Sequence, residues 1–117
     1  MSKAILNVFT NCPADQEEEF NRWYNEIHLP DILAIEGFVG ARRYKLSGPG
    51  PQMVTRSGEP AVAQYLAVYE LDTEDTGAAM KRLGPAVAEL QAKGRMFDGM
   101  QSVGAASYVA LGERQEG

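Results

Sequence analysis

Four short segments of the chain alternate hydrophobic with polar residues. An alternation with a period of two places every second side chain on the same face, which is typical of a half-buried β-strand. The four predicted strands span residues 4–10, 38–46, 65–71 and 102–111, and a polar tail follows at 112–117.

Two other segments repeat their hydrophobic residues every three or four positions, as the buried face of a helix does. The first helix is predicted at about 16–28, with Asp15 as its N-cap and Glu18 completing a capping box. Pro30 should end it near His28 or Leu29, because the residue before a proline avoids the helical conformation. Another helical turn is expected at 31–35.

The second helix is predicted after the candidate caps Asp72 and Thr73, with a kink or a break at Gly84-Pro85, where proline removes a backbone donor. Its inward stripe is Met80, Leu83, Val87 and Leu90. The order strand, helix, strand, strand, helix, strand is that of the α+β ferredoxin-like sandwich, a four-stranded antiparallel sheet with both helices on one face. We expect a single domain over residues 1–117.

Two connections differ from ordinary loops. The segment 47–63 holds three prolines and three glycines and is too long for a simple hairpin. The segment 93–101 carries Met96, Phe97 and Met100, although loops are normally polar. We expect this second loop to close over a cavity or to contact a partner chain.

The alternation assigns one face of the sheet to the helices and leaves the other face uncovered. The residues expected against the helices are Leu6, Val8, Val39, Ala41, Leu66, Val68 and Val109. The uncovered face is expected to carry Ile5, Asn7, Phe9, Arg42, Tyr44, Tyr65, Tyr69 and Tyr108. Covering this aromatic face, at about 25 cal/mol per Å² of apolar area, would be worth several kcal/mol. A homodimer with isologous pairing of the two sheets is therefore predicted.

The composition is ordinary for a soluble globular protein, with 44% hydrophobic and 23% charged residues. The formal net charge of −5 argues against nucleic acid or an anionic membrane as the main partner. No apolar run approaches the roughly 20 residues that span a bilayer, and the N-terminus does not resemble a signal peptide. The single cysteine cannot form an internal disulfide, so a cytoplasmic location is the default expectation.

The only histidine and the only tryptophan lie near the end of the first predicted helix. His28 follows Tyr24 by one turn on the apolar face that also carries Trp23. An imidazole at this place can act as a general acid or base on a carbonyl or phenol. The alternative is a histidine that only satisfies the last helix carbonyls. The helix end favours the protonated imidazole and burial favours the neutral one, so the sequence does not fix the pKa.

Arg42 and Arg43 lie on opposite strand faces, and an inward arginine can hold a carboxylate or an enolate. A pocket for a flat ligand can be lined by Tyr24, Tyr44, Tyr65 and Tyr69, although such tyrosines are more often core and interface residues. Most strand tyrosines have the parity of the uncovered face, whereas His28 lies on the helix side, and we place the pocket in the helix-side cleft. The predicted ligand-binding residues are Asn7, Trp23, Tyr24, Arg43, Tyr65 and Phe97.

No metal or cofactor is predicted. Glu26, His28 and Asp31 supply ligand types, but the first two diverge around the helix. Cys12 has no histidine motif beside it and is expected to be an inert thiol. Neither a Walker loop, nor a dinucleotide fingerprint, nor a nucleophile elbow is present, which disfavours nucleotide cofactors and serine hydrolase chemistry.

The segment WYNEIHLPDILAIEGFVGARRY at 23–44 resembles small dimeric α/β-barrel proteins of the EthD-like group. There a helix ends in a histidine followed by a proline, and a Gly-Phe pair opens the next strand. The resemblance implies paired ferredoxin-like sheets, a pocket for a small organic molecule, and His28 as the matching histidine. The superfamily includes cofactor-free quinone-forming monooxygenases, lactone isomerases, polyketide-type cyclases and haem-degrading enzymes. The haem-degrading branch uses an Asn, Trp and His set, but Trp23 and His28 belong to the first helix here, so that assignment is not transferred.

Three hypotheses follow. The first is a small cofactor-independent enzyme in which His28 transfers a proton on an aromatic or polyketide-like carbonyl compound. The reaction would be an isomerisation, a cyclisation, a carbon–carbon bond cleavage or an oxygen-dependent oxidation. The second is a non-catalytic accessory protein that holds a small metabolite in the same pocket. The third is a haem-binding protein with His28 as axial ligand.

Overall fold

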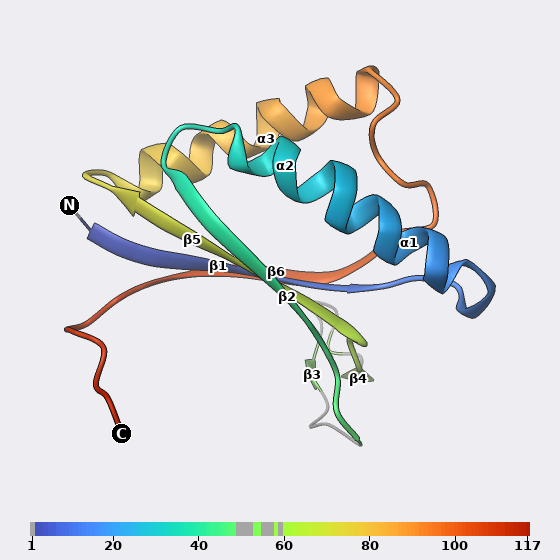
Figure 1. Ribbon diagram of the computed structural model, residues 1–117, viewed down its shortest axis with the longest axis horizontal. Helices are drawn as coiled ribbons and strands as arrows, with labels where there is room; N and C mark the ends of the chain where they lie inside the picture. Colours follow the sequence, from blue (N-terminus) through green and yellow to red (C-terminus); the bar gives the residue numbers. More distant parts are fainter. Residues whose placement is uncertain (1, 49–52, 55–57, 59) are drawn as a thin grey trace.

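The computed structural model describes residues 2–48, 53–54, 58 and 60–117 of the chain. It contains a four-stranded antiparallel sheet with the helices packed on one face (Figure 1). The strands of this sheet are β1 (Ser2–Asn11), β2 (Phe38–Lys45), β5 (Tyr65–Thr73) and β6 (Gln101–Val109). Their order across the sheet is β2-β5-β1-β6. The predicted α+β, ferredoxin-like fold is confirmed.

A small two-stranded sheet, β3 (Met53–Val54) with β4 (Pro60–Ala61), lies in the connection between β2 and β5. Within the predicted loop at 47–63, residues 49–52, 55–57 and 59 fall outside the described residues. The last strand ends two residues earlier than predicted, and the chain continues from residue 110 to the C-terminus without further regular structure.

The first helical segment is a continuous run of four pieces: η1 (Ala14–Gln16), α1 (Glu17–Trp23), the π-helical turn η2 (Tyr24–His28) and α2 (Leu29–Leu33). The predicted end near His28 is wrong, since the helix continues past Pro30. Within η2 the Leu29 N–H bonds to the Tyr24 carbonyl, five residues back. Pro30 then falls in the first turn of α2, where a missing N–H costs little.

The predicted helix caps are also wrong. Asp15 lies inside η1, and the N-cap of α1 is Gln16, which makes no side-chain capping bond. Helix α3 (Thr76–Ala92) is capped by Asp75, whose carboxylate accepts a hydrogen bond from the Ala78 N–H at 3.0 Å. This helix runs through Pro85 without a break, and its predicted stripe of Met80, Leu83, Val87 and Leu90 packs against the core.

The predicted facing of β5 is reversed. Tyr65, Ala67, Tyr69 and Leu71 are buried against the helices, so Leu66 and Val68 lie on the uncovered face. Both faces of this strand carry apolar residues, so the apolar positions alone did not show which face is buried; Glu70, on the face of Leu66 and Val68, was the one contrary sign. Tyr65 and Tyr69 thus join the helix side, which removes the conflict between the strand tyrosines and His28.

In β2 the register shifts between Phe38 and Gly40, so Phe38 and Ala41 both face the core. Val39, which was expected against the helices, is 63% exposed. Val109 is also largely exposed, because it lies on the edge strand β6. In β1 the prediction holds: Leu6 is buried and Val8 packs against the core.

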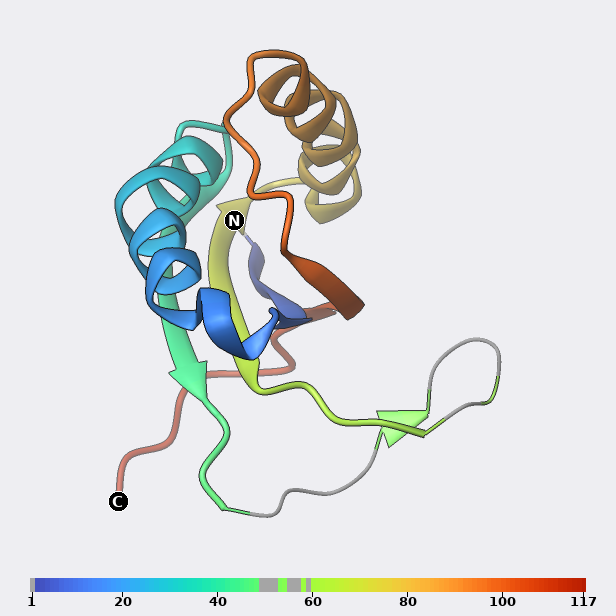
Figure 2. The same ribbon diagram turned by 90° about the vertical axis from the view of Figure 1, so that its right-hand side faces the viewer.

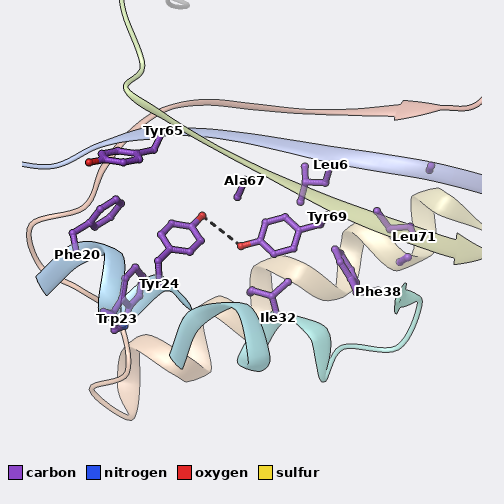
Figure 3. Close-up of a cluster of buried hydrophobic side chains, with 12 residues drawn as sticks. Leu6, Phe20, Trp23, Tyr24, Ile32, Phe38, Tyr65, Ala67, Tyr69 and Leu71 are labelled. Atoms are coloured by element: carbon purple, nitrogen blue, oxygen red, sulfur yellow. Dashed lines mark hydrogen bonds between the residues drawn. The ribbon is translucent and has the colours of Figure 1, made fainter. Parts of the chain in front are cut away.

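The core lies between the sheet and the helical layer and is rich in aromatic side chains (Figure 3). Phe20 is fully buried at its centre and contacts the rings of Trp23, Tyr24, Tyr65 and Phe97. Figure 2 shows α1 and α2 beside α3 over the same face, with the orange segment after α3 descending between them toward β6. The predicted apolar loop is this segment, and its Met96, Phe97 and Met100 pack on the core.

Candidate functional site

The π-helical turn places Trp23 and His28 against each other. Their rings stack at 4.7 Å between centroids and 21° between planes, although five positions separate them in sequence. The Tyr24 ring meets the imidazole edge-on at 4.9 Å and 89°. A widened turn is what brings residues at this spacing onto one side of a helix, and such turns occur frequently at functional sites. His28 is only 7% exposed as a result.

Burial keeps the His28 imidazole neutral. The pKa falls from 6.5 to about 4, chiefly through loss of solvation; the nearby Arg43 cation acts in the same direction, and Asp31 opposes both. The ring therefore carries no charge at neutral pH. Its Nδ1 atom is buried and has no hydrogen-bond partner among the described residues. A buried polar atom left in this state costs roughly 1–3 kcal/mol, so it is a place where a ligand hydrogen bond would be favourable.

Two buried phenols continue the site toward the sheet. The Tyr69 hydroxyl on β5 donates to the Tyr24 hydroxyl on η2 over 3.4 Å, as the dashed line in Figure 3 marks. Desolvation raises the pKa of both tyrosines, so both remain protonated at neutral pH. The pair offers two uncharged hydroxyl groups between Tyr69 and Tyr24, and the ring of Tyr24 contacts the imidazole.

Arg43 approaches Tyr24 from β2. Its guanidinium carbon lies 4.3 Å from the Tyr24 ring centroid and within 5.5 Å of the rings of Phe20 and Tyr65. The guanidinium donates to the side-chain oxygens of Asn21 at 2.9 Å and Asn25 at 3.1 Å. A cavity of about 380 Å³ opens here between α1–η2 and the strands, lined by Asn21, Asn25, Arg43, Tyr44, Lys45 and Tyr65.

The segment after α3 covers the other side of the imidazole cluster. The Trp23 indole N–H donates to the Arg95 carbonyl at 2.7 Å, and the Phe97 ring lies 5.6 Å from the indole. Arg95 is tied to α2 by a bidentate ion pair with Asp31, with N–O distances of 2.7 and 3.1 Å. Phe97 also lines a cavity of about 550 Å³ between this segment and α3.

The fold brings most of the predicted site residues together. His28, Trp23, Tyr24 and Phe97 form one contiguous cluster, and Arg43 with Tyr65 lies on the far side of Tyr24. Asn7 does not join them: it pairs in register with Val68 and Ala106 on the uncovered face of the sheet. Its Oδ1 atom is buried there and has no hydrogen-bond partner in the described part of the chain, and its ligand-binding role stays a prediction.

Tyr69 was considered as a pocket residue but was assigned to the uncovered face and left out of the predicted set, and Asn21 and Asn25 were not predicted at all. Glu70 could have shown that Tyr69 faces the helices. A carboxylate is expected on the uncovered face, and the adjacent residue of a strand then points to the opposite face. The two asparagines lie four positions apart on one side of the helix, and only the facing of Arg43 links them to the site.

Among the described residues no cluster of three or more His, Cys, Asp or Glu side chains is arranged to hold a metal ion. Nor does any helix in that part of the chain have the length and apolarity to cross a membrane.

Solved structures share this fold at low sequence identity. A protein from Shewanella loihica PV-4, described as a "putative monooxygenase", is 19% identical with a TM-score of 0.61, over 97% of this chain and 99% of that one. HapK from Hahella chejuensis is 16% identical with a TM-score of 0.60, over 100% and 99% of the two chains. An EthD-like protein from Ralstonia eutropha JMP134 is 17% identical with a TM-score of 0.57, over 97% and 96%. At these identities the likeness shows the fold alone.

A search among curated proteins finds no match. A family model described as a domain of unknown function, DUF4286, matches residues 3–92. Because this match covers most of the chain, the protein belongs to the DUF4286 family.

Proposed function

We propose that the protein is a small cofactor-independent enzyme that moves a proton on an aromatic or polyketide-like carbonyl compound. The observation that carries this proposal is the His28 imidazole, which is buried and neutral and whose Nδ1 bonds to none of the described residues. A neutral imidazole with a free acceptor nitrogen is the form that a general base requires. The EthD-like fold, with its resemblance at residues 23–44, agrees with this chemistry.

In this reaction His28 takes a proton from an acidic C–H or O–H of the ligand, and the electron pair remains on the ligand as an enolate or phenolate. The same imidazolium returns the proton at another position, as an isomerisation or a cyclisation requires. An imidazole with a pKa of about 4 is a weak base in the free protein. The anion that forms beside it compensates the burial of the imidazolium and so raises the pKa during the reaction.

The remaining site residues bind the ligand. Trp23 and Phe97 supply flat apolar surface, and Tyr24 supplies a neutral hydroxyl that can donate to a carbonyl. Arg43, held beside Tyr24 and Tyr65, supplies the positive charge that favours an anion. Because His28 is nearly inaccessible, a ligand reaches it only when one of the side chains that cover it moves.

The enzyme is distinguished from an accessory binding protein by conversion of its ligand. Aromatic and polyketide-like carbonyl compounds that raise the Tm of the protein are the candidates, because a ligand that binds only the folded state stabilises it. Each should be incubated with the protein and followed by mass spectrometry and NMR. An enzyme converts at least one of them, whereas an accessory protein returns all of them unchanged.

We further propose that two copies pair through the uncovered face of the sheet, in the cytoplasm. Apolar side chains stay in water on this face, with Val39 63% and Tyr108 57% exposed. Ile5 and Phe9 lie on the same face by register, and a second sheet would cover all four.

The dimer predicts the effect of a charge at Val39. Wild-type protein should sediment at twice the 12.8 kDa of one chain, and Val39→Glu should sediment as a monomer, because the carboxylate would be buried against the partner. Leu111→Glu is the matched control, since Leu111 lies in the fully exposed tail and the same substitution there should leave the dimer intact. A wild-type protein that sediments as a monomer contradicts the assembly.

A further inference from the structure

Arg43 is half-buried and has no carboxylate partner among the described residues, whereas three more exposed arginines have one. Arg22, Arg95 and Arg114 each form an ion pair with an acidic side chain within the described part of the chain. Arg43 is less exposed than these three, yet its acceptors there are the neutral amides of Asn21 and Asn25. A charge withdrawn from water is costly unless an opposite charge compensates it.

The surroundings of Arg43 hold its guanidinium in place without saturating it. The ring of Tyr24 lies beneath the guanidinium, and two amide oxygens fix it from the helix. A guanidinium has five N–H donors, and these two bonds use two of them. The remaining donors are available to an acceptor in the cavity of about 380 Å³.

The second cation of this cavity is already compensated. Lys45 donates to the Glu17 carboxylate at 2.9 Å, and the same carboxylate accepts from the Tyr65 hydroxyl. The net charge that the cavity offers to a ligand is therefore the single positive charge of Arg43. The rings of Tyr44 and Tyr65, which line the cavity, suit a flat group attached to the anion.

We infer that Arg43 anchors the carboxylate of a small aromatic acid in the cavity between α1–η2 and β2. The carboxylate accepts from the free guanidinium donors, and the side-chain amides of Asn21 and Asn25 orient the fork that presents them. The inference builds on the proposed function, in which Arg43 belongs to the ligand site, and it gives the substrate class: the compound that the enzyme converts is an acid.

Benzoate and its neutral analogue benzamide test this anchor directly by titration calorimetry at pH 7 and low salt. Wild-type protein should bind benzoate saturably at millimolar concentration and bind benzamide at least tenfold more weakly. Arg43→Gln should weaken benzoate binding at least tenfold. Arg42→Gln is the matched control, because Arg42 is the neighbouring arginine on the uncovered face, and its loss should change benzoate affinity less than twofold.

A second measurement does not depend on the folding of the variant. In wild-type protein, benzoate should shift the side-chain NH₂ signals of Asn21 and Asn25, and benzamide should leave them in place. The anchor is overturned by equal binding of the two compounds, by equal losses in the two arginine variants, or by no saturable benzoate binding. Benzoate binding that survives in a protein with no His28-dependent turnover would instead overturn the proposed reaction and leave the anchor standing.

Discussion

Replacing His28 with glutamine is expected to lower turnover of the converted ligand by about 10²–10⁴-fold, the usual contribution of a positioned acid–base group. Glutamine is close to histidine in size and keeps a hydrogen-bonding side chain, so the pocket should retain its shape. It has no group that can accept and return a proton. The rate constant kcat should therefore fall while the ligand Kd changes by only a few-fold, as single-turnover kinetics and calorimetry would measure.

Trp23→Phe serves as the control for this variant. Phenylalanine keeps a flat ring beside His28 but loses the indole donor to the Arg95 carbonyl, so it perturbs the same cluster without touching the proton-transfer group. We expect it to raise KM more than it lowers kcat. Turnover that is unchanged in His28→Gln would show that the imidazole only fills the core.

The second large effect is a loss of stability in mild acid. The folded state holds His28 neutral with a pKa of about 4, whereas the unfolded chain protonates it near 6.5. Between these values the unfolded state binds more protons, so the free energy of unfolding falls as the pH falls from 6.5 toward 4. At about 1.4 kcal/mol for each pH unit, the loss from this residue is about 3 kcal/mol by pH 4.

Denaturant unfolding of wild type and His28→Gln at pH 7, 6, 5 and 4 measures this loss. The variant has no imidazole to protonate, and its free energy of unfolding should therefore fall less steeply below pH 6.5. Acidic side chains contribute equally to both proteins, so the difference between the two slopes isolates His28. Identical pH dependence of the two proteins would mean that His28 is already solvated in the folded state.

The fold was readable from the sequence because its signals are redundant. Turn residues separate the six main elements, and the periods of two and of three to four place each of them within a few residues of its observed bounds. Local details carried less information. The helix passes through Pro30 because the π-helical turn of residues 24–28 places the proline where its missing donor is harmless, and nothing in the local pattern predicts such a turn.

The candidate site could be predicted only in part, because several of its residues lie on β5, whose buried face was assigned incorrectly. The segment YLAVYEL has apolar residues on both faces, and it was predicted with the wrong face toward the helices. Tyr65 and Tyr69 were therefore expected on the uncovered side. The register shift after Phe38 interrupts the alternation of β2, and Val39 was therefore also assigned to the wrong face. His28, Trp23 and Tyr24 were grouped correctly because one helix face carries all three, whereas their contacts with Tyr69 and Phe97 depend on tertiary packing.

An NMR titration of His28 tests whether its imidazole is enclosed and neutral in the folded protein. The chain has a single histidine, so the imidazole signals need no further assignment. Following the ring nitrogens of labelled wild-type protein from pH 8 downward should show a neutral ring in the folded state, with a midpoint near 4. A folded protein whose imidazole titrates near 6.5 has a ring in contact with water, and that result would contradict the enclosed, neutral base on which the account rests.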